Sequence, residues 1–498
     1  MKYVIGIDLG SSAVKAIVVD RGGIVHLTLS KQYPMIQEKS GFSEQDTEQW
    51  YIKTKEILTE VVKKFNGKKE DIEGISFSGQ MHGLVLLDEN HHVLRNAILW
   101  NDTRTYKQCE EVVEALGRDR LLAITKNQAL EGFTLPKLLW VKENEPDIYK
   151  RAHCLLLPKD YLRYRLTGNI AMDYSDAAGT LLLNVEKKEW SKEVCEVFQI
   201  DENILPPLVE SHAYVGNITE TFAQETGLPV SAKVFAGGAD NACGAIGAGI
   251  LTGGKTLCSI GTSGVVLSYE EPNHKDYQGK VHYFNHGKEN AFYSMGVTLS
   301  AGYSLSWFRD VFAEKDSFNS LLDGIDDIPP GSNGLLFSPY LAGERTPHAD
   351  ASIRASFIGM DANHTKKHFI RSVLEGVTFS LKEALDILRE SNPSIETIIS
   401  IGGGTKNKEW LQMQADIFNT EIITLSNEQG PALGAAILAA YGCGWYSSLQ
   451  DCARVFISYE ESYLPIPENV ETYERLYALY KKVYQQTKEL NDGLRGFR

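Results

Sequence analysis

Near its beginning the chain reads Gly6-Ile7-Asp8-Leu9-Gly10-Ser11-Ser12-Ala13-Val14-Lys15, and in its second half it reads Thr256-Leu257-Cys258-Ser259-Ile260-Gly261-Thr262-Ser263-Gly264-Val265. Each stretch is an apolar strand, a turn of glycine and hydroxyl residues, and a second strand. We interpret the pair as a structural duplication, in which two similar domains each open with a hairpin whose turn offers N–H and hydroxyl donors. Two unrelated hairpins are the alternative.

The residues around the first hairpin predict a mixed sheet covered by helices. We expect strands at 3–9, 14–20 and 72–77, and a helix at 49–65, where apolar residues recur at helical spacing. A hairpin followed by a β–α crossover is typical of the α/β class. Glycines crowd at residues 247–254, so we place a boundary there and predict domains 1–248 and 249–498. A tail helix at 472–491 is expected to pack on the second domain.

Composition restricts the class of partner and the compartment. The 498 residues carry a formal net charge of -15, which argues against a general nucleic-acid-binding face but not against a nucleotide ligand held by backbone N–H groups. The first residues form a strand and not a signal peptide, and the longest small-apolar run, 431–441, is too short to span a membrane. Seven dispersed cysteines indicate reduced thiols, a cytoplasmic protein and no structural zinc site.

A single carboxylate follows the strand-like run Val234–Ala236, within Gly237-Gly238-Ala239-Asp240-Asn241-Ala242-Cys243. The carboxyl end of a strand is where an α/β sheet usually carries its chemistry, and small neighbours let a substrate approach closely. The functional interpretation makes Asp240 a reactive group. The structural alternative is an aspartate that caps the helix that follows.

Two further segments have the composition of phosphate sites. Asp8 ends a buried strand directly before Gly10-Ser11-Ser12, a turn with hydrogen-bond donors for phosphate. A carboxylate repels phosphate by itself, so this pairing is expected if Mg²⁺ lies between the two groups. Gly402-Gly403-Gly404 links a strand at 398–401 to a helix near Asn407, so that a ligand could lie on the backbone. An aspartate that stabilises its own hairpin and an ordinary tight β–α turn are the alternatives.

Three polar loops and one motif match complete the pattern. Ser78–Gly83 could hydrogen-bond a polyhydroxylated ligand, and Trp100–Arg104 combines polar groups with an aromatic wall; the chemistry of Gly343–His348 stays open.

Residues 249–256 fit the P-loop pattern G-x-x-x-x-G-K-[ST]. A P-loop needs a helix that begins at its lysine, and a β-rich run follows here, so we reject that interpretation.

With these motifs in order, the chain resembles the FGGY carbohydrate kinases over roughly residues 3–485. Beyond the segments above, the resemblance rests on Leu157-Pro158-Lys159-Asp160-Tyr161, Ser175-Asp176-Ala177-Ala178-Gly179 and Gly430-Pro431-Ala432-Leu433-Gly434-Ala435-Ala436. The segments Gln80-Met81-His82 and Glu344-Arg345-Thr346-Pro347-His348 look most like the members that act on D-xylulose. The family's first turn usually reads Gly-Thr-Ser/Thr, and Gly10-Ser11-Ser12 keeps the hydroxyl.

The resemblance implies an α/β fold of two actin-like (ribonuclease-H-like) domains flanking an interdomain cleft, with the sugar mainly on the first and ATP mainly on the second. It implies that Asp240 is the general base and that Asp8, with Asp240, holds Mg²⁺. The implied sugar contacts are Met81, His82, Trp100, Asn241 and Asp240. The implied nucleotide contacts are Ser11, Ser12, Gly261, Thr262, Ser263, Gly302, Gly403, Gly404 and Asn407.

The implied reaction is transfer of the γ-phosphate of ATP to the 5-hydroxyl of D-xylulose, a step of D-xylose catabolism. Three rivals stay open: a kinase for another sugar or polyol such as ribulose, gluconate or glycerol, an actin-like ATPase, and a non-catalytic sugar-binding regulator. Met81 and His82 argue against most of the first group, and Asp240 argues against the other two. The partners are then a small sugar and ATP, with no nucleic acid and no membrane. The oligomeric state is open, with a homodimer as one candidate by analogy.

Overall fold

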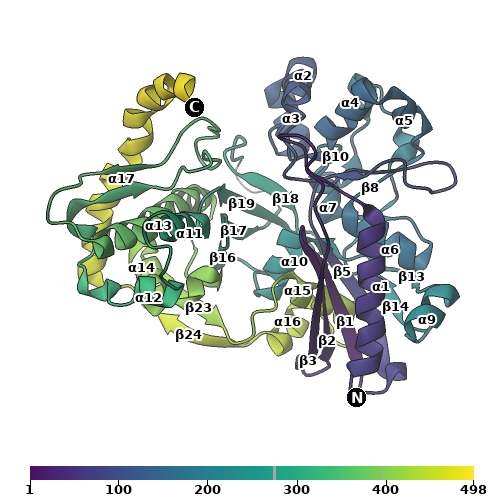
Figure 1. The fold of residues 1–498 in the computed structure, drawn as a ribbon. Helices are drawn as coiled ribbons and strands as arrows, with labels where there is room; N and C mark the ends of the chain where they lie inside the picture. Colours follow the sequence, from purple (N-terminus) through teal and green to yellow (C-terminus); the bar gives the residue numbers. More distant parts are fainter. Residues whose placement is uncertain (273–275, 393) are drawn as a thin grey trace. The chain divides into compact units, whose positions relative to one another are not determined.

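The computed structural model describes residues 1–272, 276–392 and 394–498 (Figure 1). The chain forms two compact α/β units. The first comprises Met1–Leu251, Tyr283–Tyr293 and Gln429–Ser458, and the second comprises Thr252–His282, Ser294–Glu428 and Tyr459–Arg498. The division of labour predicted for 1–248 and 249–498, sugar on one and ATP on the other, stays a prediction.

The main sheet of the first unit has the strand order β13-β14-β5-β1-β2-β3. Strands β1 (Tyr3–Leu9), β2 (Ala13–Asp20) and β3 (Val25–Gln32) form an antiparallel meander, and β5 (Ile72–Gly79) runs parallel to β1. Two short strands, β14 (Lys233–Phe235) and β15 (Gly238–Ala239), also run parallel to β5, and β13 (Tyr214–Asn217) closes the edge. The carboxyl ends of β1, β5 and β15 therefore meet at one edge of the sheet.

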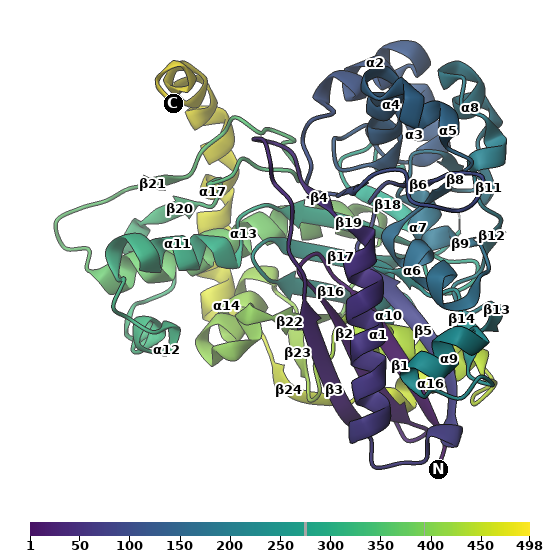
Figure 2. The ribbon, with the colours of Figure 1, turned by 45° about the vertical axis from the view of Figure 1, so that its right-hand side comes forward.

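Helices cover both faces of this sheet. On one face, Ile5 and Ile7 of β1 share a core with Trp50 of α1 (Thr47–Lys64), which lies along the strands in Figure 2. On the other face lie α10 (Asp240–Gly247) and α15 (Pro431–Gly442), followed by α16 (Leu449–Phe456). Gly6 allows this packing, because a Cβ atom there would lie 2.1 Å from the carbonyl oxygen of Ala432.

The rest of the first unit is mostly short helices joined by small strands. Its helices are α2 (Tyr106–Leu116), α3 (Arg118–Thr125), α4 (Thr134–Asn144), α5 (Pro146–Arg151), α6 (Pro158–Thr167), α7 (Tyr174–Ala178), α8 (Lys192–Phe198) and α9 (Glu220–Thr226). Its small strands are β4 (Glu44–Gln45), β6 (Val85–Leu87), β7 (Ala97–Ile98), β8 (Cys154–Leu156), β9 (Met172–Asp173), β10 (Leu183–Asn184), β11 (Glu189–Trp190) and β12 (Leu208–Val209).

A second sheet has the order β18-β19-β17-β16-β22-β23-β24. Its strands are β16 (Lys255–Ile260), β17 (Gly264–Glu270), β18 (His282–Asn285), β19 (Phe292–Thr298), β22 (Thr397–Gly402), β23 (Glu421–Leu425) and β24 (Tyr459–Tyr463). The hairpin β16–β17 with β22 parallel to β16 repeats the arrangement of β1, β2 and β5, so the predicted similarity of the two openings is confirmed. Lys255 begins a strand, which also confirms that this segment is not a P-loop.

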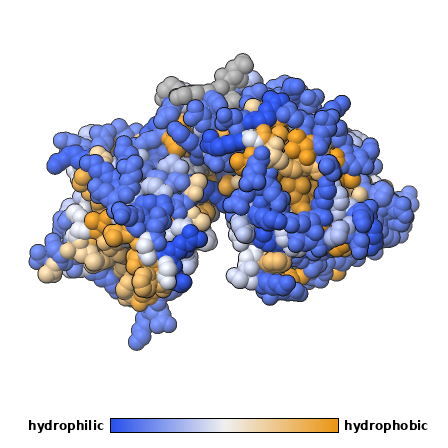
Figure 3. Space-filling view, turned by 90° about the horizontal axis from the view of Figure 1, so that it is seen from above, coloured by the Kyte–Doolittle hydropathy of each residue, from blue (hydrophilic) through white to orange (hydrophobic). Residues whose placement is uncertain are grey.

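Helices of the second unit are α11 (Gly302–Phe312), α12 (Phe318–Leu322), α13 (Lys366–Ser391), α14 (Lys408–Phe418) and α17 (Pro467–Leu494); a small hairpin pairs β20 (Leu336–Ser338) with β21 (Ser356–Ile358). The predicted tail helix is α17, whose Tyr477 stacks on Phe379 of α13. Apolar side chains gather in the cores, and the face shown in Figure 3 is largely hydrophilic with separate apolar patches.

Candidate active site

Asp240 is the first residue of α10 and directly follows β15. The N-cap residue is Ala239, which has no side-chain donor or acceptor, so Asp240 is not the helix cap. Its Oδ1 accepts hydrogen bonds from the backbone N–H of Asn241 at 2.7 Å and from Asn241 Nδ2 at 3.1 Å. Burial and the nearby Asp8 carboxylate raise the pKa of Asp240 to about 7.

Asp8 lies at the same edge of the sheet, near the end of β1. It stands opposite Lys15 of β2 and Ser78 of β5, while Gly238 of β15 pairs with the other side of Ser78. Burial raises the pKa of Asp8, against the lowering effect of Ser78 and Lys15. The topology thus brings together the two carboxylates that the sequence analysis singled out, although they lie far apart in the chain.

The turn after β1 is held by polar contacts from neighbouring loops. Gln45 Nε2 donates to the Ser11 carbonyl at 2.6 Å, and Trp100 Nε1 donates to Ser11 Oγ at 2.8 Å. The Ser12 carbonyl accepts from Tyr33 N at 3.1 Å. The indole of Trp100, which is 42% exposed, therefore stands beside the hydroxyl turn.

Met81 and His82 follow β5 and lie near Asp240. Met81 Sδ is 3.7 Å from Asn241 Nδ2 and 3.8 Å from the hydroxyl of Tyr293. His82 has a φ of 67°, unusual for a residue other than glycine, and its Nδ1 is 2.6 Å from the carbonyl of Gly179. Met81, Asn241 and Asp240 thus form one continuous group, with His82 next in the chain.

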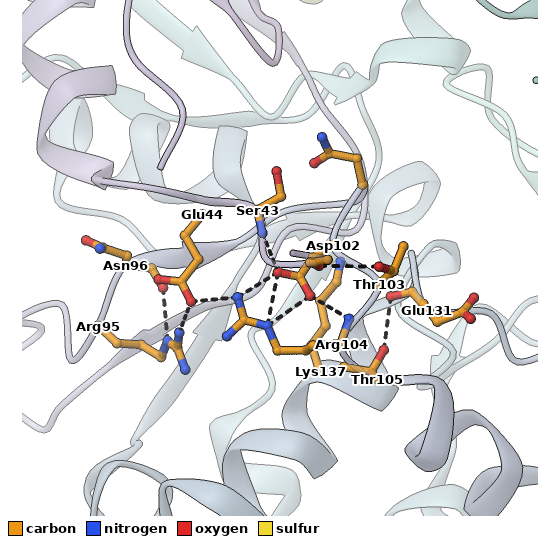
Figure 4. Close-up of polar contacts among 12 residues, drawn as sticks. Ser43, Glu44, Arg95, Asn96, Asp102, Thr103, Arg104, Thr105, Glu131 and Lys137 are labelled. Carbon is orange, nitrogen blue, oxygen red and sulfur yellow. Dashed lines mark hydrogen bonds and ion pairs between the residues drawn. The ribbon is translucent and has the colours of Figure 1, made fainter. Parts of the chain in front are cut away.

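A buried charged cluster, shown in Figure 4, supports the loop that carries Trp100. The Asp102 carboxylate accepts from Arg104 Nη2 at 2.6 Å and from the backbone N–H of Ser43 at 2.6 Å. Glu44 in turn bridges Arg104 and Arg95. This role of the arginines and Glu44 could not be predicted from the sequence, because most of their partners come from other segments. Only the Asp102–Arg104 pair is close in the chain.

In the second unit, a cavity of about 700 Å³ lies where the sequence analysis placed the nucleotide. Its wall includes the predicted residues Gly261, Thr262, Gly302, Gly403, Gly404 and Asn407. Ser263 belongs to the same turn, where its carbonyl accepts from Gly261 N–H, but it is not part of the wall. Further wall residues that were not predicted include Tyr303, Phe318, Leu322 and Trp410. A volume of this size is typical of small-molecule sites.

Two helix N-termini reach this cavity. Gly302 begins α11, and its N–H donates to the Gly261 carbonyl at 2.8 Å, so that helix and turn are joined. Asn407 is the N-cap of α14, where its Oδ1 accepts from Trp410 N at 2.8 Å. Gly402 has a φ of 87° and leads into the turn. Helix N-termini and glycine turns offer N–H donors to phosphate groups.

Comparison with known proteins places the chain in a family. Residues 3–247 match the N-terminal domain of the FGGY family of carbohydrate kinases, and residues 256–443 match its C-terminal domain. The chain belongs to the FGGY family of carbohydrate kinases. This FGGY kinase is 60% identical to the xylulose kinase of Bacillus subtilis (strain 168) over 498 residues, which is the whole of both chains.

Solved structures agree with the fold of this FGGY kinase. A ligand-bound xylulose kinase from Lactobacillus acidophilus superposes with a TM-score of 0.93 at 28% identity and covers 98% of this chain and 99% of its own. A gluconate kinase from the same organism has the same TM-score and identity, with 98% of each chain covered. The predicted α/β fold of two actin-like domains is confirmed, whereas overall shape does not separate one sugar from another.

This FGGY kinase is an ATP-dependent sugar kinase, as the sequence analysis expected. Family membership favours the enzyme over its two non-kinase rivals, the actin-like ATPase and the sugar-binding regulator. None of the helices in the described part of the chain has both the length and the apolar character that crossing a bilayer needs.

Proposed function

We propose that this kinase transfers the γ-phosphate of ATP to the 5-hydroxyl of D-xylulose. The observation that carries the proposal is the 60% identity to the Bacillus subtilis xylulose kinase over the full length of both chains. Lower identity often leaves the acceptor open in a family with several sugars, but a full-length match at this level favours a shared substrate.

Asp240 is the proposed general base. Both Asn241 donors hold Oδ1, so Oδ2 is the oxygen that we assign to the acceptor hydroxyl. As the new O–P bond forms and the bond from phosphorus to the leaving oxygen of ADP breaks, the hydroxyl proton passes to this carboxylate. A carboxylate whose pKa is raised to about 7 is a stronger base than an ordinary aspartate, and about half of it is still ionised at neutral pH.

The sugar would lie along the group formed by Met81, His82 and Asn241, with Trp100 as an aromatic wall. Met81 presents a soft, adaptable surface, whereas the imidazole and the amide can hydrogen-bond hydroxyl groups. The backbone of Met81 is anchored next to β1, because Gln80 N donates to the Leu9 carbonyl at 2.9 Å. The pocket for the acceptor is thus tied to the strand that carries Asp8.

ATP would occupy the cavity of the second unit, in contact with Gly261, Thr262, Ser263, Gly302, Gly403, Gly404 and Asn407, while Ser11 and Ser12 would bind the transferring phosphate. Asp8 and Asp240 lie at one edge of the sheet, and the charge of Asp8 raises the pKa of Asp240. Such a pair of carboxylates is suited to a divalent cation that prefers oxygen ligands, such as Mg²⁺. Asp8 and Asp240 would hold it. When bound, the cation would neutralise phosphate charge.

The acceptor is tested by ADP release with Mg-ATP and D-xylulose, D-ribulose, L-ribulose, gluconate, glycerol or no acceptor. A strong preference for D-xylulose supports the proposal. Preference for another acceptor would contradict the substrate while keeping the kinase, and equal turnover without acceptor would contradict the transfer itself.

The role of Asp240 is tested separately with Asp240→Asn. We expect kcat to fall by about 10²–10⁴-fold, the usual contribution of a general base. Calorimetric binding of D-xylulose should change little, because the amide keeps the shape of the side chain. Near-normal turnover of this variant would contradict the assignment.

Two predictions about context stay open to direct measurement. The seven cysteines are free thiols in the structure, in keeping with the predicted cytoplasmic site. The oligomeric state, for which a homodimer is one candidate, can be tested by sedimentation equilibrium of the purified chain.

A further inference from the structure

Two sequence motifs have no part in the proposed chemistry, Leu157–Tyr161 and Ser175–Gly179. The structure brings them together inside the first unit. Lys159 and Asp160 lie in the first turn of α6, and Ser175 and Asp176 lie in α7. The side chains of all four are fully buried. Buried charges are expensive unless each is paired, so this arrangement needs a specific explanation.

The Lys159 ammonium is the centre of the cluster. Nζ lies 2.7 Å from Asp160 Oδ1, 2.8 Å from Asp173 Oδ1 and 3.1 Å from Asp176 Oδ2. Three neighbouring carboxylates have the composition of a metal site. Here Lys159 Nζ lies among them instead: it donates a hydrogen bond to Asp160 Oδ1 and forms ion pairs with Asp173 and Asp176. Burial lowers the pKa of Lys159 and the three carboxylates raise it; the carboxylates prevail and keep the lysine charged.

Asp173 connects this charge to two serine hydroxyls. Its Oδ1 faces Lys159, and its Oδ2 accepts hydrogen bonds from Ser175 Oγ, from the Ser175 backbone N–H at 2.9 Å and from Ser211 Oγ at 2.8 Å. A hydroxyl that donates its proton to a carboxylate presents its lone pairs elsewhere. Ser175 Oγ uses one of them to accept the backbone N–H of Ala239 at 2.9 Å.

Ala239 is the N-cap of α10, and Asp240 is the next residue. In a capping box, the side chain of the third helical residue bonds the N-cap N–H. That residue is Ala242 here, which has no polar side chain. Ser175, from another helix, makes this contact instead. The backbone direction at the start of α10 sets where the Asp240 carboxylate points. The hydrogen bond from Ala239 N–H to Ser175 Oγ, one residue before Asp240, can therefore control the position of that carboxylate.

We propose that Ser175, oriented by Asp173 and Lys159, is a positioning residue that holds the Ala239 backbone and thereby aims the carboxylate of Asp240 at the acceptor hydroxyl. The inference rests on the proposed function, in which Asp240 is the general base. Ser175 itself touches neither the substrate nor the reacting atoms in this assignment.

The test compares Ser175→Ala with Ser211→Ala in the full chain. Both substitutions remove a hydroxyl donor from Asp173 Oδ2, and both positions are buried, but only Ser175 contacts Ala239. We expect Ser175→Ala to lower kcat by about tenfold or more, as misplaced catalytic groups do, with both KM values within about twofold. Ser211→Ala should keep kcat within about twofold of the wild type while losing similar thermal stability.

Equal losses of kcat in the two variants, or no loss in Ser175→Ala, would overturn the proposal. If Ser175→Ala does not fold, Ser175→Cys provides the same comparison, because a thiol is close in size but a weak acceptor. A normal kcat for that variant would also overturn it.

A double-mutant cycle separates positioning from general damage. In the Asp240→Asn background the residual turnover should not fall further on Ser175→Ala, because no carboxylate remains to be aimed. A further fall of about tenfold would indicate a structural role and overturn the proposal. High activity of Asp240→Asn alone would instead refute the proposed general base, so the two failures are distinguishable.

Discussion

The ammonium group of Lys137 donates a hydrogen bond to the backbone carbonyl of His82 at 3.0 Å. The same Nζ donates to the carbonyl of Gly132 at 2.6 Å, and Thr134 Oγ1 donates to the His82 carbonyl at 3.0 Å. Lys137 is fully buried in the first turns of α4, where its positive charge opposes the helix dipole. Its hydrogen bond instead holds the carbonyl of His82, a residue in the left-handed backbone conformation.

From this contact we expect Lys137→Met to weaken sugar binding selectively. Loss of a hydrogen bond that satisfies a buried carbonyl costs about 1–3 kcal/mol, so the KM for D-xylulose should rise by about fivefold or more. The KM for ATP should stay within about twofold. Steady-state kinetics with each substrate varied in turn measures both constants.

Lys142→Met is the matched control for this prediction. Lys142 lies in the same helix and also donates to backbone carbonyls, those of Phe198 and Gln199, away from His82. It should leave the sugar KM within about twofold, since it removes the same kind of group elsewhere. An unchanged sugar KM in Lys137→Met would refute the link between Lys137 and His82.

The same lysine predicts how stability depends on pH. Burial lowers the pKa of Lys137 from 10.5 to about 7, against the raising effect of Asp102. Between these values the unfolded chain holds one proton that the folded protein has released. The free energy of unfolding should therefore rise with pH from about 7 to about 10.5 and be independent of this group below about pH 7.

Urea unfolding of the wild type and of Lys137→Met at several pH values tests this sign. The wild type should gain stability relative to the variant between about pH 7.5 and about pH 9.5, because only the wild type carries the titrating group. A difference between the two proteins that is the same at every pH would show that Lys137 has an ordinary pKa.

Strand topology explains why both carboxylates could be predicted. Asp8 lies near the end of β1 and Asp240 directly follows β15, and parallel strands bring their carboxyl ends to one edge. The glycines that line the cavity proposed for ATP could be found for a similar reason, since tight turns after strands favour glycine. In both cases a short segment of sequence, an apolar strand followed by a turn, is enough to predict where the functional group lies.

The supporting residues could not be predicted in this way. Lys137 acts on a carbonyl 55 positions away, and Ser175 acts on an N–H 64 positions away. Their partners are backbone atoms, which have no sequence signature. Nor did any local pattern indicate that α15, near the end of the chain, packs against Gly6 of β1. Such contacts depend on how distant segments fold together.

The loop Gly343–His348, whose chemistry the composition left open, carries a buried acceptor. Glu344 accepts from Thr298 Oγ1 at 2.6 Å, from Ser380 Oγ at 2.9 Å and from the N–H groups of Leu299 and Arg345 at 3.2 and 2.8 Å. It thereby joins the loop to the end of β19, just before α11 begins. The segment is thus joined to the strand that leads into α11, whose first residues line the cavity proposed for ATP.

Gly302 gives the sharpest prediction for that cavity. A Cβ atom there would lie 2.5 Å from the Gly261 carbonyl oxygen, a backbone atom that cannot turn aside as a flexible side chain would. Gly302→Ala should displace the turn, and since such overpacking costs about 1–3 kcal/mol, the KM for ATP should rise by about fivefold or more. Gly253→Ala is the control in the same unit, because a Cβ atom at Gly253 meets nothing within 4 Å. The measurement is steady-state kinetics with ATP and D-xylulose varied separately. The KM for D-xylulose should be normal in both variants. If the KM for ATP is the same in Gly302→Ala and Gly253→Ala, the turn does not bind the nucleotide.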